Sequence, residues 1–417
     1  MIRLRVKNFG PIHDGMKEND GWLEFKRVTA FVGNQGSGKS TLAKLFSTFS
    51  WIEKALVRGD YEKKWFERRG RLQNQFFSYH RLENYIEPDG LSAAEIEYEG
   101  EAYCFRFSRG QLTITQREEN NYRLPQVMYV PSERNFISYI RHPREIKLSS
   151  ESLKEFLTEF DNAKSNMKGS IQLPINNAEL EYDKLNDILN IKDSRYKLRL
   201  TDASSGFQSF VPLFLVSQYL AETVNKERDS AQPPMTTDEL ERFKQGVEGI
   251  FSNSALTEEQ KRVALSVLSS RFNKTAFINI VEEPEQNLFP TSQWEILKGL
   301  LALNNQGKHN RLVLTTHSPY IANYLSIAVL GQQLRGRIEK SPKREVLLAR
   351  LGEIIPLDSL VSFEDIAIYQ TDQKLGVVNE LPSINKIPSD KNYLNDALRT
   401  GNNLFDKLLE LEEELLE

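Results

Sequence analysis

A glycine-rich stretch at residues 33–40 reads Gly-Asn-Gln-Gly-Ser-Gly-Lys-Ser. It fits the pattern G-x-x-x-x-G-K-[ST] and lies between an expected apolar strand at 28–32 and an expected helix from Lys39 to about Trp51. Glycines in such a loop let backbone N–H groups converge on phosphate oxygens, and the helix start adds a favourable dipole. The sequence predicts an ATP site in which Lys39 reaches the β- and γ-phosphates and the Ser40 hydroxyl holds Mg²⁺. The residues expected to line it are Asn34, Gln35, Gly36, Ser37, Gly38, Lys39, Ser40 and Thr41.

Two adjacent acids, Glu282 and Glu283, follow an apolar segment at 277–281 that is expected to form a buried strand. We expect Glu282 to hold the Mg²⁺ shell, usually through water, and Glu283 to orient and polarise the attacking water. A solvated acidic strand end is the alternative explanation, and the phosphate-loop motif favours the catalytic one. Many enzymes with this loop have Asp where Glu282 stands, and an indirect contact tolerates the longer side chain.

A histidine, His317, follows a third apolar segment at 312–314, which is also expected to be a strand. A lone histidine is more often structural. This one comes 34 residues after Glu283 and directly after a strand, which favours a catalytic role. We expect its imidazole to hydrogen-bond the γ-phosphate and the catalytic water.

Three small or amide residues, Ser205, Gly206 and Gln208, precede an apolar helix expected at 210–219. A helix start of this kind is a candidate anion site, since its free N–H groups attract negative charge. A capped helix start explains the same residues equally well. Their place between the phosphate loop and the acidic strand favours the anion site.

The composition restricts the other possibilities. The chain has 417 residues, a net charge of -4, one cysteine and five histidines, which excludes disulfides and leaves little for a histidine or cysteine metal cluster. It contains no apolar run near the roughly 18 residues of a membrane helix, and the alternating residues 1–7 do not resemble a signal peptide. We therefore expect a cytoplasmic protein that has no membrane partner.

The expected elements form one composite α/β unit in three segments. Residues 1–140 are expected to form a nucleotide-binding lobe whose flank, at 91–116, consists of short antiparallel strands. Residues 141–272 are expected to form a helical lobe that carries Ser205, with mostly helical stretches at 150–195 and 236–272. Residues 273–417 are expected to return to the parallel sheet and end in a helix. Further strands are expected at 2–6, 127–130 and 365–369.

The order of these motifs resembles the ABC-type ATPase heads of the SMC, Rad50, RecF and OLD group, and residues 4–12 resemble the way those heads begin. The resemblance spans nearly the whole chain and implies an ABC-type P-loop fold that hydrolyses ATP. It also implies that Ser205, Gly206 and Gln208 form a signature motif facing the ATP of a second subunit, so that two heads pair head to tail. Residues 286–290 then occupy the D-loop position.

The chain departs from the pattern of that group in two places. The signature has Phe207 where a second glycine is usual, and the segment 129–134 lacks the Q-loop glutamine. Glu133 and Arg134 are the candidates to replace that glutamine. Only 162 residues separate Lys39 from Thr201, without the heptads of a long coiled coil, and no D-x-D pair of a Toprim nuclease occurs.

Two segments, 204–213 and 282–290, make the chain look like compact ATPases of the AAA15/AAA21 kind. That resemblance implies an ATPase subunit of a bacterial antiphage system such as PARIS or Septu. Such subunits act beside a separate effector, often a nuclease, and respond to a phage-derived trigger. A RecF-like DNA-repair ATPase and a non-hydrolysing ATP-gated scaffold are the alternatives, and nucleic acid remains a possible partner.

The C-terminal segment repeats leucine at helical spacing. Its leucines fall on one helix face, opposite a strongly acidic face, and six acids stand against one lysine in 404–417. This helix is expected to pack either on its own head or on a neighbouring subunit or effector. Basic stretches at 54–81 and 335–350 are candidate contacts for the acidic face. The leucines concerned are Leu404, Leu408, Leu411 and Leu415.

Overall fold

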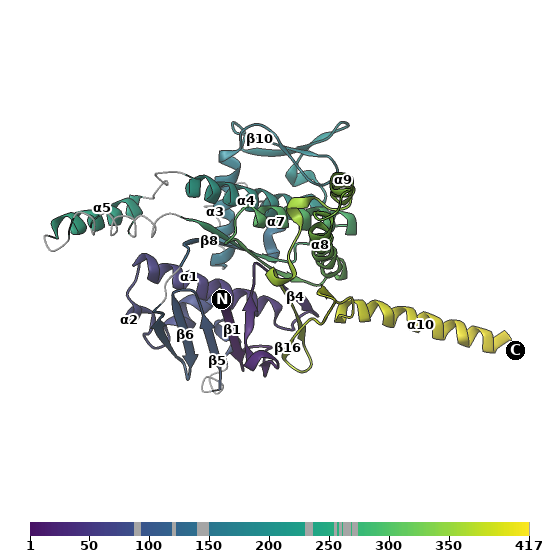
Figure 1. Ribbon diagram of the computed structural model, residues 1–417, viewed down its shortest axis with the longest axis horizontal. Coiled ribbons are helices and arrows are strands. Elements are labelled where there is room, and N and C mark those ends of the chain that lie inside the picture. Colours follow the sequence, from purple (N-terminus) through teal and green to yellow (C-terminus); the bar gives the residue numbers. More distant parts are fainter. Residues whose placement is uncertain are drawn as a thin grey trace.

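A seven-stranded sheet forms the centre of the computed structural model, which describes residues 1–86, 93–118, 122–139, 150–229, 237–253, 257, 261, 268 and 274–416. The strand order is β2-β16-β15-β4-β14-β13-β8, and the five strands from β15 to β8 run parallel (Figure 1). Because helices cover both faces, β4 and β13 are buried along their whole length. The strands are β2 Gly15–Met16, β4 Val28–Gly33, β8 Pro125–Val130, β13 Ala276–Glu282, β14 Arg311–Thr316, β15 Ile366–Asp372 and β16 Val377–Glu380.

These strands confirm the expected α/β class and the apolar segments from which it was inferred. Each parallel strand except β15 leads directly into a group of residues that the sequence predicts to belong to the ATP site. The carboxyl ends of parallel strands meet at one edge of a sheet, so the groups after β4, β14 and β13 are brought together there.

One face of the central sheet carries helix α1, Lys39–Arg58, and beyond it an antiparallel sheet ordered β3-β1-β5-β6-β7. Stacked aromatic rings join the two layers: Phe25 lies 4.0 Å from Phe46, and Phe49 lies 5.4 Å from Tyr98, between ring centroids. The antiparallel flank expected at 91–116 is confirmed by its described strands. The flank strands are β1 Ile2–Lys7, β3 Leu23–Phe25, β5 Glu95–Glu99, β6 Tyr103–Ser108 and β7 Gln111–Gln116.

On the other face of the sheet, the described residues form long helices that share one large apolar core. They are α3 Glu151–Asn166, α4 Ser205–Asp229, α7 Pro290–Asn305 and α8 Pro319–Ile338. A small antiparallel sheet lies over α3 and α4 and has the order β12-β11-β10-β9 (Figure 1). Its strands are β9 Ile171–Gln172, β10 Glu179–Asp183, β11 Ile188–Lys192 and β12 Lys197–Arg199.

The expectation of a mostly helical 150–195 is therefore wrong for its second half. Buried Leu180, Leu189 and Ile191 alternate with exposed or half-buried neighbours, most of them polar, which is the period of a strand. Positive φ angles at Asn176, Asn177 and Asp187 turn the chain between these strands, where a helix would need φ below zero. The polar composition of the segment had suggested an exposed helix instead.

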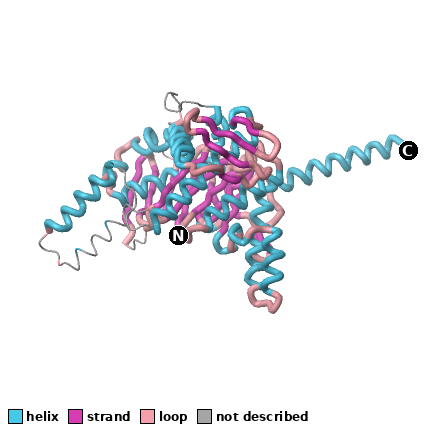
Figure 2. The backbone as a smooth tube through the Cα atoms, turned by 90° about the horizontal axis from the view of Figure 1, so that it is seen from above, coloured by secondary structure: helices cyan, strands magenta, loops and turns pink. Residues whose placement is uncertain are grey.

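Helical elements project from the body of the described chain (Figure 2). They are α5, the hairpin of α8 and α9, and α10, with bounds Thr237–Ser252 for α5, Arg344–Ile354 for α9 and Tyr393–Leu416 for α10. Helix α5 accounts for the first part of the helical stretch expected at 236–272, and most of the remainder lies outside the described residues. In the described part of the chain, no helix combines the length and apolarity that a bilayer span requires.

Short elements complete the described chain. The helical ones are η1 Asn19–Gly21, α2 Lys63–Phe66, the π-helical η2 Leu72–Phe77, η3 Glu83–Tyr85, η4 Ser132–Tyr139, η6 Leu200–Asp202, η7 Leu357–Ser359 and η8 Phe363–Asp365. A two-stranded ribbon pairs β17 Ser383–Ile384 with β18 Ile387–Pro388.

Candidate functional site

The phosphate-type loop joins β4 to α1 and needs its glycines for two physical reasons. Gly36 and Gly38 have φ of 71° and 100°, in the left-handed region that side chains with a Cβ avoid. A Cβ on Gly33 would lie 2.6 Å from the Thr371 carbonyl oxygen, and one on Gly38 would lie 2.9 Å from a carbon of Ile12. The loop is therefore held close between β15 and the start of the chain, and it delivers the N-terminus of α1 to the carboxyl edge of the sheet.

Lys39 is buried at the first position of α1 and folds back over this loop. Its Nζ donates to the carbonyl oxygens of Gly33 at 2.9 Å and Asn34 at 2.7 Å, and lies 3.4 Å from His317 Nδ1. Burial lowers the pKa of Lys39 to about 8, opposed by the negative charges of Glu283 and its neighbours. The lysine, the histidine and the second acid, which are far apart in sequence, therefore lie in one place.

His317 stands between Lys39 and Glu283. Its Nε2 is 3.6 Å from Glu283 Oε1, and both side chains remain about one-third exposed, at 32% and 34%, so a bound molecule can reach them. Burial and the charge of Lys39 lower the pKa of His317, so the imidazole is neutral at pH 7. A hydrogen bond from the imidazole to the Gly33 backbone opposes this lowering of the pKa.

Glu283 is held in a conformation that is uncommon for its residue type. Its φ is 45°, and its backbone N–H donates to the Thr315 carbonyl oxygen at 2.8 Å, across from β13 to β14. Burial, with the adjacent charge of Glu282, raises the pKa of Glu283 above its usual value. A carboxylate with a raised pKa is a better proton acceptor, which suits a group that polarises water.

Glu282 is the last residue of β13 and is buried. Its Oε2 accepts a hydrogen bond from the Ser132 backbone N–H at 3.2 Å, which fixes the carboxylate at the sheet edge. Among the described residues, no group of three His, Cys, Asp or Glu side chains could hold a metal ion by itself. Mg²⁺ is usually bound by one or two protein oxygens together with phosphates and water. A buried carboxylate and the Ser40 hydroxyl, which lies at the start of α1, fit that requirement.

The third acid of the cluster, Glu285, is a further functional residue besides those predicted from the sequence. Its Oε1 accepts hydrogen bonds from Thr316 Oγ1 and from the His317 backbone N–H, both at 2.8 Å. Burial raises the pKa of Glu285. This carboxylate positions the loop that carries His317. The signal was present in the sequence as the last residue of Glu-Glu-Pro-Glu.

Arg134 lies beside the acids, at the position where a Q-loop glutamine was expected. It is fully buried, and its guanidinium donates to three carbonyl oxygens: Glu282 at 2.6 Å, Glu283 at 2.5 Å and Pro131 at 3.2 Å. A fourth bond, at 3.1 Å, reaches the Ser209 carbonyl oxygen in α4. Burial lowers the pKa of Arg134 to about 10, so it remains cationic at pH 7.

The other candidate for that place, Glu133, is half exposed and lies 3.8 Å from Arg81 on the surface. Of the two residues, Arg134 is therefore the one that connects the acidic strand end to helix α4.

The signature candidates divide into an outward-facing and an inward-facing group. Ser205 is exposed at the start of α4, and no described hydrogen bond or ion pair joins it to the phosphate-type loop of its own chain. Gln208 is buried, and its Nε2 donates to the carbonyl oxygens of Thr201 and Ala203, both at 3.0 Å. Gln208 therefore braces the segment that leads into α4.

The segment that follows the acidic cluster passes close to α4 at Gly206, where a side chain would not fit. A Cβ at Gly206 would lie 2.9 Å from the Asn287 carbonyl oxygen. Asn287 has a φ of 59°, and its Nδ2 donates to Ser209 Oγ at 3.1 Å. The segment 286–290 therefore lies against the signature helix within one chain.

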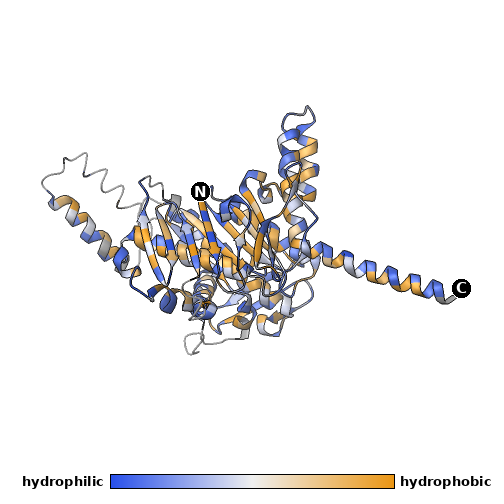
Figure 3. Ribbon diagram, turned by 90° about the horizontal axis from the view of Figure 1, so that it is seen from below, coloured by the Kyte–Doolittle hydropathy of each residue, from blue (hydrophilic) through white to orange (hydrophobic). Residues whose placement is uncertain are grey.

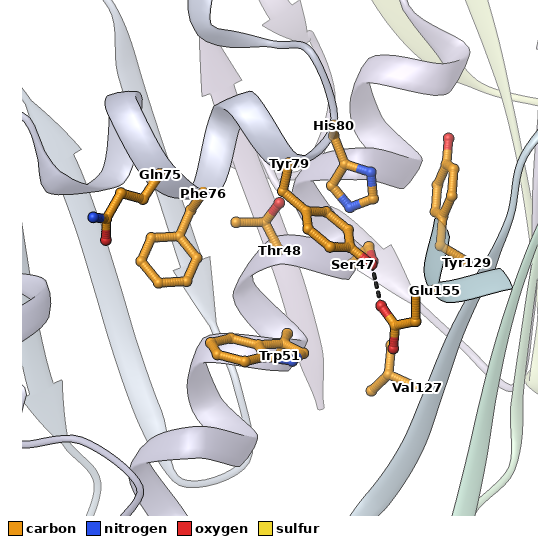
Figure 4. A pocket seen from close by; sticks show the side chains of 10 residues that line it. All are labelled: Ser47, Thr48, Trp51, Gln75, Phe76, Tyr79, His80, Val127, Tyr129 and Glu155. Carbon is orange, nitrogen blue, oxygen red and sulfur yellow. Dashed lines mark hydrogen bonds between the residues drawn. The ribbon is translucent and has the colours of Figure 1, made fainter. Parts of the chain in front are cut away.

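A separate cavity of about 370 Å³ lies on the distal half of α1 (Figure 4). Half of its ten lining residues carry an aromatic ring, among them Trp51, Phe76 and Tyr79, and the Tyr79 hydroxyl donates to Glu155. None of the residues predicted to bind nucleotide lines this cavity.

The glycine loop, the buried lysine and the adjacent acids at the edge of a parallel sheet define a P-loop nucleotide-binding protein. The chain belongs to the family described as AAA domain, putative AbiEii toxin, Type IV TA system, whose model matches residues 28–323. No curated protein matches the sequence.

Two solved structures illustrate the likeness in fold. The SMC head domain from Thermotoga maritima is 13% identical, with 92% of this chain and 98% of that chain covered and a TM-score of 0.36. The ATP-binding cassette MJ0796, in a dimeric post-hydrolysis state bound to ADP and Pi, is 10% identical, with 92% of this chain and 100% of that chain covered and a TM-score of 0.29. Both likenesses are distant, and the assignment depends on the family match and on the geometry of the site.

Proposed function

We propose that this chain binds and hydrolyses ATP with Mg²⁺ at the loop of residues 33–41. The observation that carries the proposal is the continuous contact from Lys39 through His317 to Glu283, at 3.4 Å and 3.6 Å. A cation for the phosphates, a neutral imidazole and a carboxylate of raised pKa are the groups that phosphoryl transfer to water uses.

Each residue has a defined part in this proposal. Lys39 exchanges its carbonyl partners for phosphate oxygens, and its charge stabilises the phosphates. Glu283 accepts a hydrogen bond from the attacking water and polarises it, while His317 hydrogen-bonds the terminal phosphate and that water. Ser40 and Glu282 would hold Mg²⁺, which supplies positive charge at the phosphate oxygens.

The proposal further includes a second chain. Ser205 and Gly206 lie at the start of the long helix α4, and Ser205 is exposed, so the free N–H groups of this helix start can face an anion outside the chain. Two chains arranged head to tail would each offer this surface to the ATP of the other. Gln208 supports that surface from inside.

For the biological role, we propose an ATPase sensor or scaffold subunit of a cytoplasmic antiphage defence system. Its support is the family description, which names a toxin of a toxin–antitoxin system, and the compact AAA15/AAA21-like motif forms. Such a subunit would restrain a separate effector, expected to be a nuclease, until a phage-derived trigger arrives.

The first test is the rate of phosphate release by the wild-type chain and by Lys39→Ala. The variant is expected to lose at least about 100-fold in rate, because it removes the charge that contacts the phosphates. Lys44→Ala is the matched control, since Lys44 lies on the same helix outside the loop, and it should retain the wild-type rate. Full activity of Lys39→Ala would refute the assignment of this site. If the wild type binds ATP but releases no phosphate, the result would instead support a non-hydrolysing scaffold.

A further inference from the structure

Helix α10 is exposed on all sides over most of its length. Every residue from Asp396 to Glu414 is exposed, including Leu404 at 58%, Leu408 at 64% and Leu411 at 55%. The helix is joined to the body only near its start, where Leu394 is buried and Asn395 Nδ2 donates to Asn323 Oδ1 at 3.1 Å. The alternative that this helix packs on its own head is therefore wrong.

The apolar face of α10 is a candidate contact surface. Helical stability in proteins comes mainly from packing an apolar face, and this face is exposed over most of the 24 residues of α10. The leucines of α10 recur at spacings of four and three residues and form one face, seen as an apolar stripe along the helix (Figure 3). The opposite face is acidic, and Glu412 and Glu414 extend the negative charge to both flanks of the leucine stripe, which limits what can cover the helix.

The α8–α9 hairpin offers a surface of the opposite character. Leu330 and Leu334 on α8 and Val346 and Ile354 on α9 are all exposed, at spacings of four and eight residues that place each pair on one side of its helix. The turn between the helices and the start of α9 are basic. In the described part of the chain these cations form no ion pair: Arg337, Lys340, Lys343 and Arg344.

The charges of the two elements are complementary. Residues 404–417 hold six acids against one lysine, and residues 335–350 hold six basic residues against two acids. Pairing two α10 helices in parallel would bring two acidic segments together, whereas the hairpin brings acids to bases. Within one chain α10 points away from the hairpin, so the hairpin that it contacts has to belong to another chain (Figures 1 and 2).

We propose that α10 of one chain packs its leucine face on the α8–α9 hairpin of a second copy, with the acids that flank this face, Glu412 and Glu414, against the basic turn. A two-fold axis would make the exchange reciprocal, so that the dimer holds two identical contacts. The leucines supply most of the contact and the charges set its direction. This docking uses no residue of the ATP site and does not need nucleotide.

Cross-linking in the absence of nucleotide tests which surfaces meet. In a Cys104→Ser background, which removes the one native cysteine, Leu408→Cys protein is mixed with Val346→Cys protein and treated with a short bismaleimide. We expect a covalent dimer in this mixture and none when Leu185→Cys, on the 97%-exposed turn after β10, replaces the hairpin variant. Cross-linking of Leu408→Cys to itself with none to the hairpin would show α10 self-pairing and overturn the proposal.

Exchanging the charges on the two surfaces shows whether a loss of the dimer comes from this interface or from misfolding of the variant. The full chain should have twice its 48.1 kDa mass by light scattering without ATP. Lys340→Glu with Lys343→Glu and Arg344→Glu should weaken the dimer by about tenfold or more. Adding Glu412→Lys and Glu414→Lys, on the two flanks of the leucine face, to that variant should restore it. A monomeric wild-type chain, or a triple variant as dimeric as the wild type, would overturn the proposal.

Discussion

Glu283→Gln is expected to keep ATP binding and to slow hydrolysis by about 100- to 10,000-fold, which is the usual contribution of a positioned proton acceptor. The amide has the shape of the carboxylate and leaves the backbone contact to Thr315 intact, but it cannot polarise water in the same way. Because hydrolysis would no longer release the nucleotide, the variant should accumulate as an ATP-bound pair of chains. Phosphate release and retention of labelled ATP measure the two effects.

Glu282→Gln is the matched control, since it makes the same change one residue earlier. It is expected to raise the Mg²⁺ concentration needed for the half-maximal rate, because its carboxylate is assigned to the metal shell. If Glu282→Gln instead traps ATP while Glu283→Gln turns over at the wild-type rate, the two roles are exchanged.

Arg134→Met is expected to lower the free energy of unfolding by about 3 kcal/mol or more. The guanidinium bonds four backbone carbonyl oxygens around the acidic strand end and α4, and methionine would leave these buried acceptors without donors. Denaturant unfolding measures the loss. Arg81→Met removes a surface arginine nearby and should change the stability by less than about 0.5 kcal/mol.

Arg134→Lys separates positioning from simple stability. Lysine keeps the positive charge, but it lacks the planar guanidinium whose several N–H groups bond the end of the strand and the helix at the same time. We expect it to recover part of the stability while the turnover rate stays low, since the carbonyls of Glu282 and Glu283 lose their fixed donor. An Arg134→Met chain that is as stable and as active as the wild type would contradict the role assigned to this arginine.

The sequence predicted the central sheet and the gathering of Lys39, Glu283 and His317 because short apolar segments each end in a polar motif. A parallel strand that is buried on both faces appears in the sequence as a short continuous apolar run. The carboxyl ends of such strands meet at one edge of the sheet. The contact between Lys39 and His317 spans 278 residues, yet it follows from this rule.

Other features depend on contacts that no local pattern specifies. The sequence offered Glu133 and Arg134 equally, and only the packing of η4 against α4 decides which one is buried. Gln208 was expected to face a nucleotide with Ser205, but helix α4 directs its amide inward. The strands at 171–199 were missed because their short apolar alternation lies in a polar segment.

The central claim is that ATP is hydrolysed at a site completed by a second chain. Its most direct test is to mix Lys39→Ala protein, which has a defective loop, with Ser205→Arg protein, whose signature surface is blocked. Each variant alone should be nearly inactive. An equal mixture should recover about a quarter of the wild-type rate of phosphate release, because half of the pairs are mixed and each has one intact site of two. No recovery at any ratio, with co-assembly of the two variants demonstrated, would contradict the account.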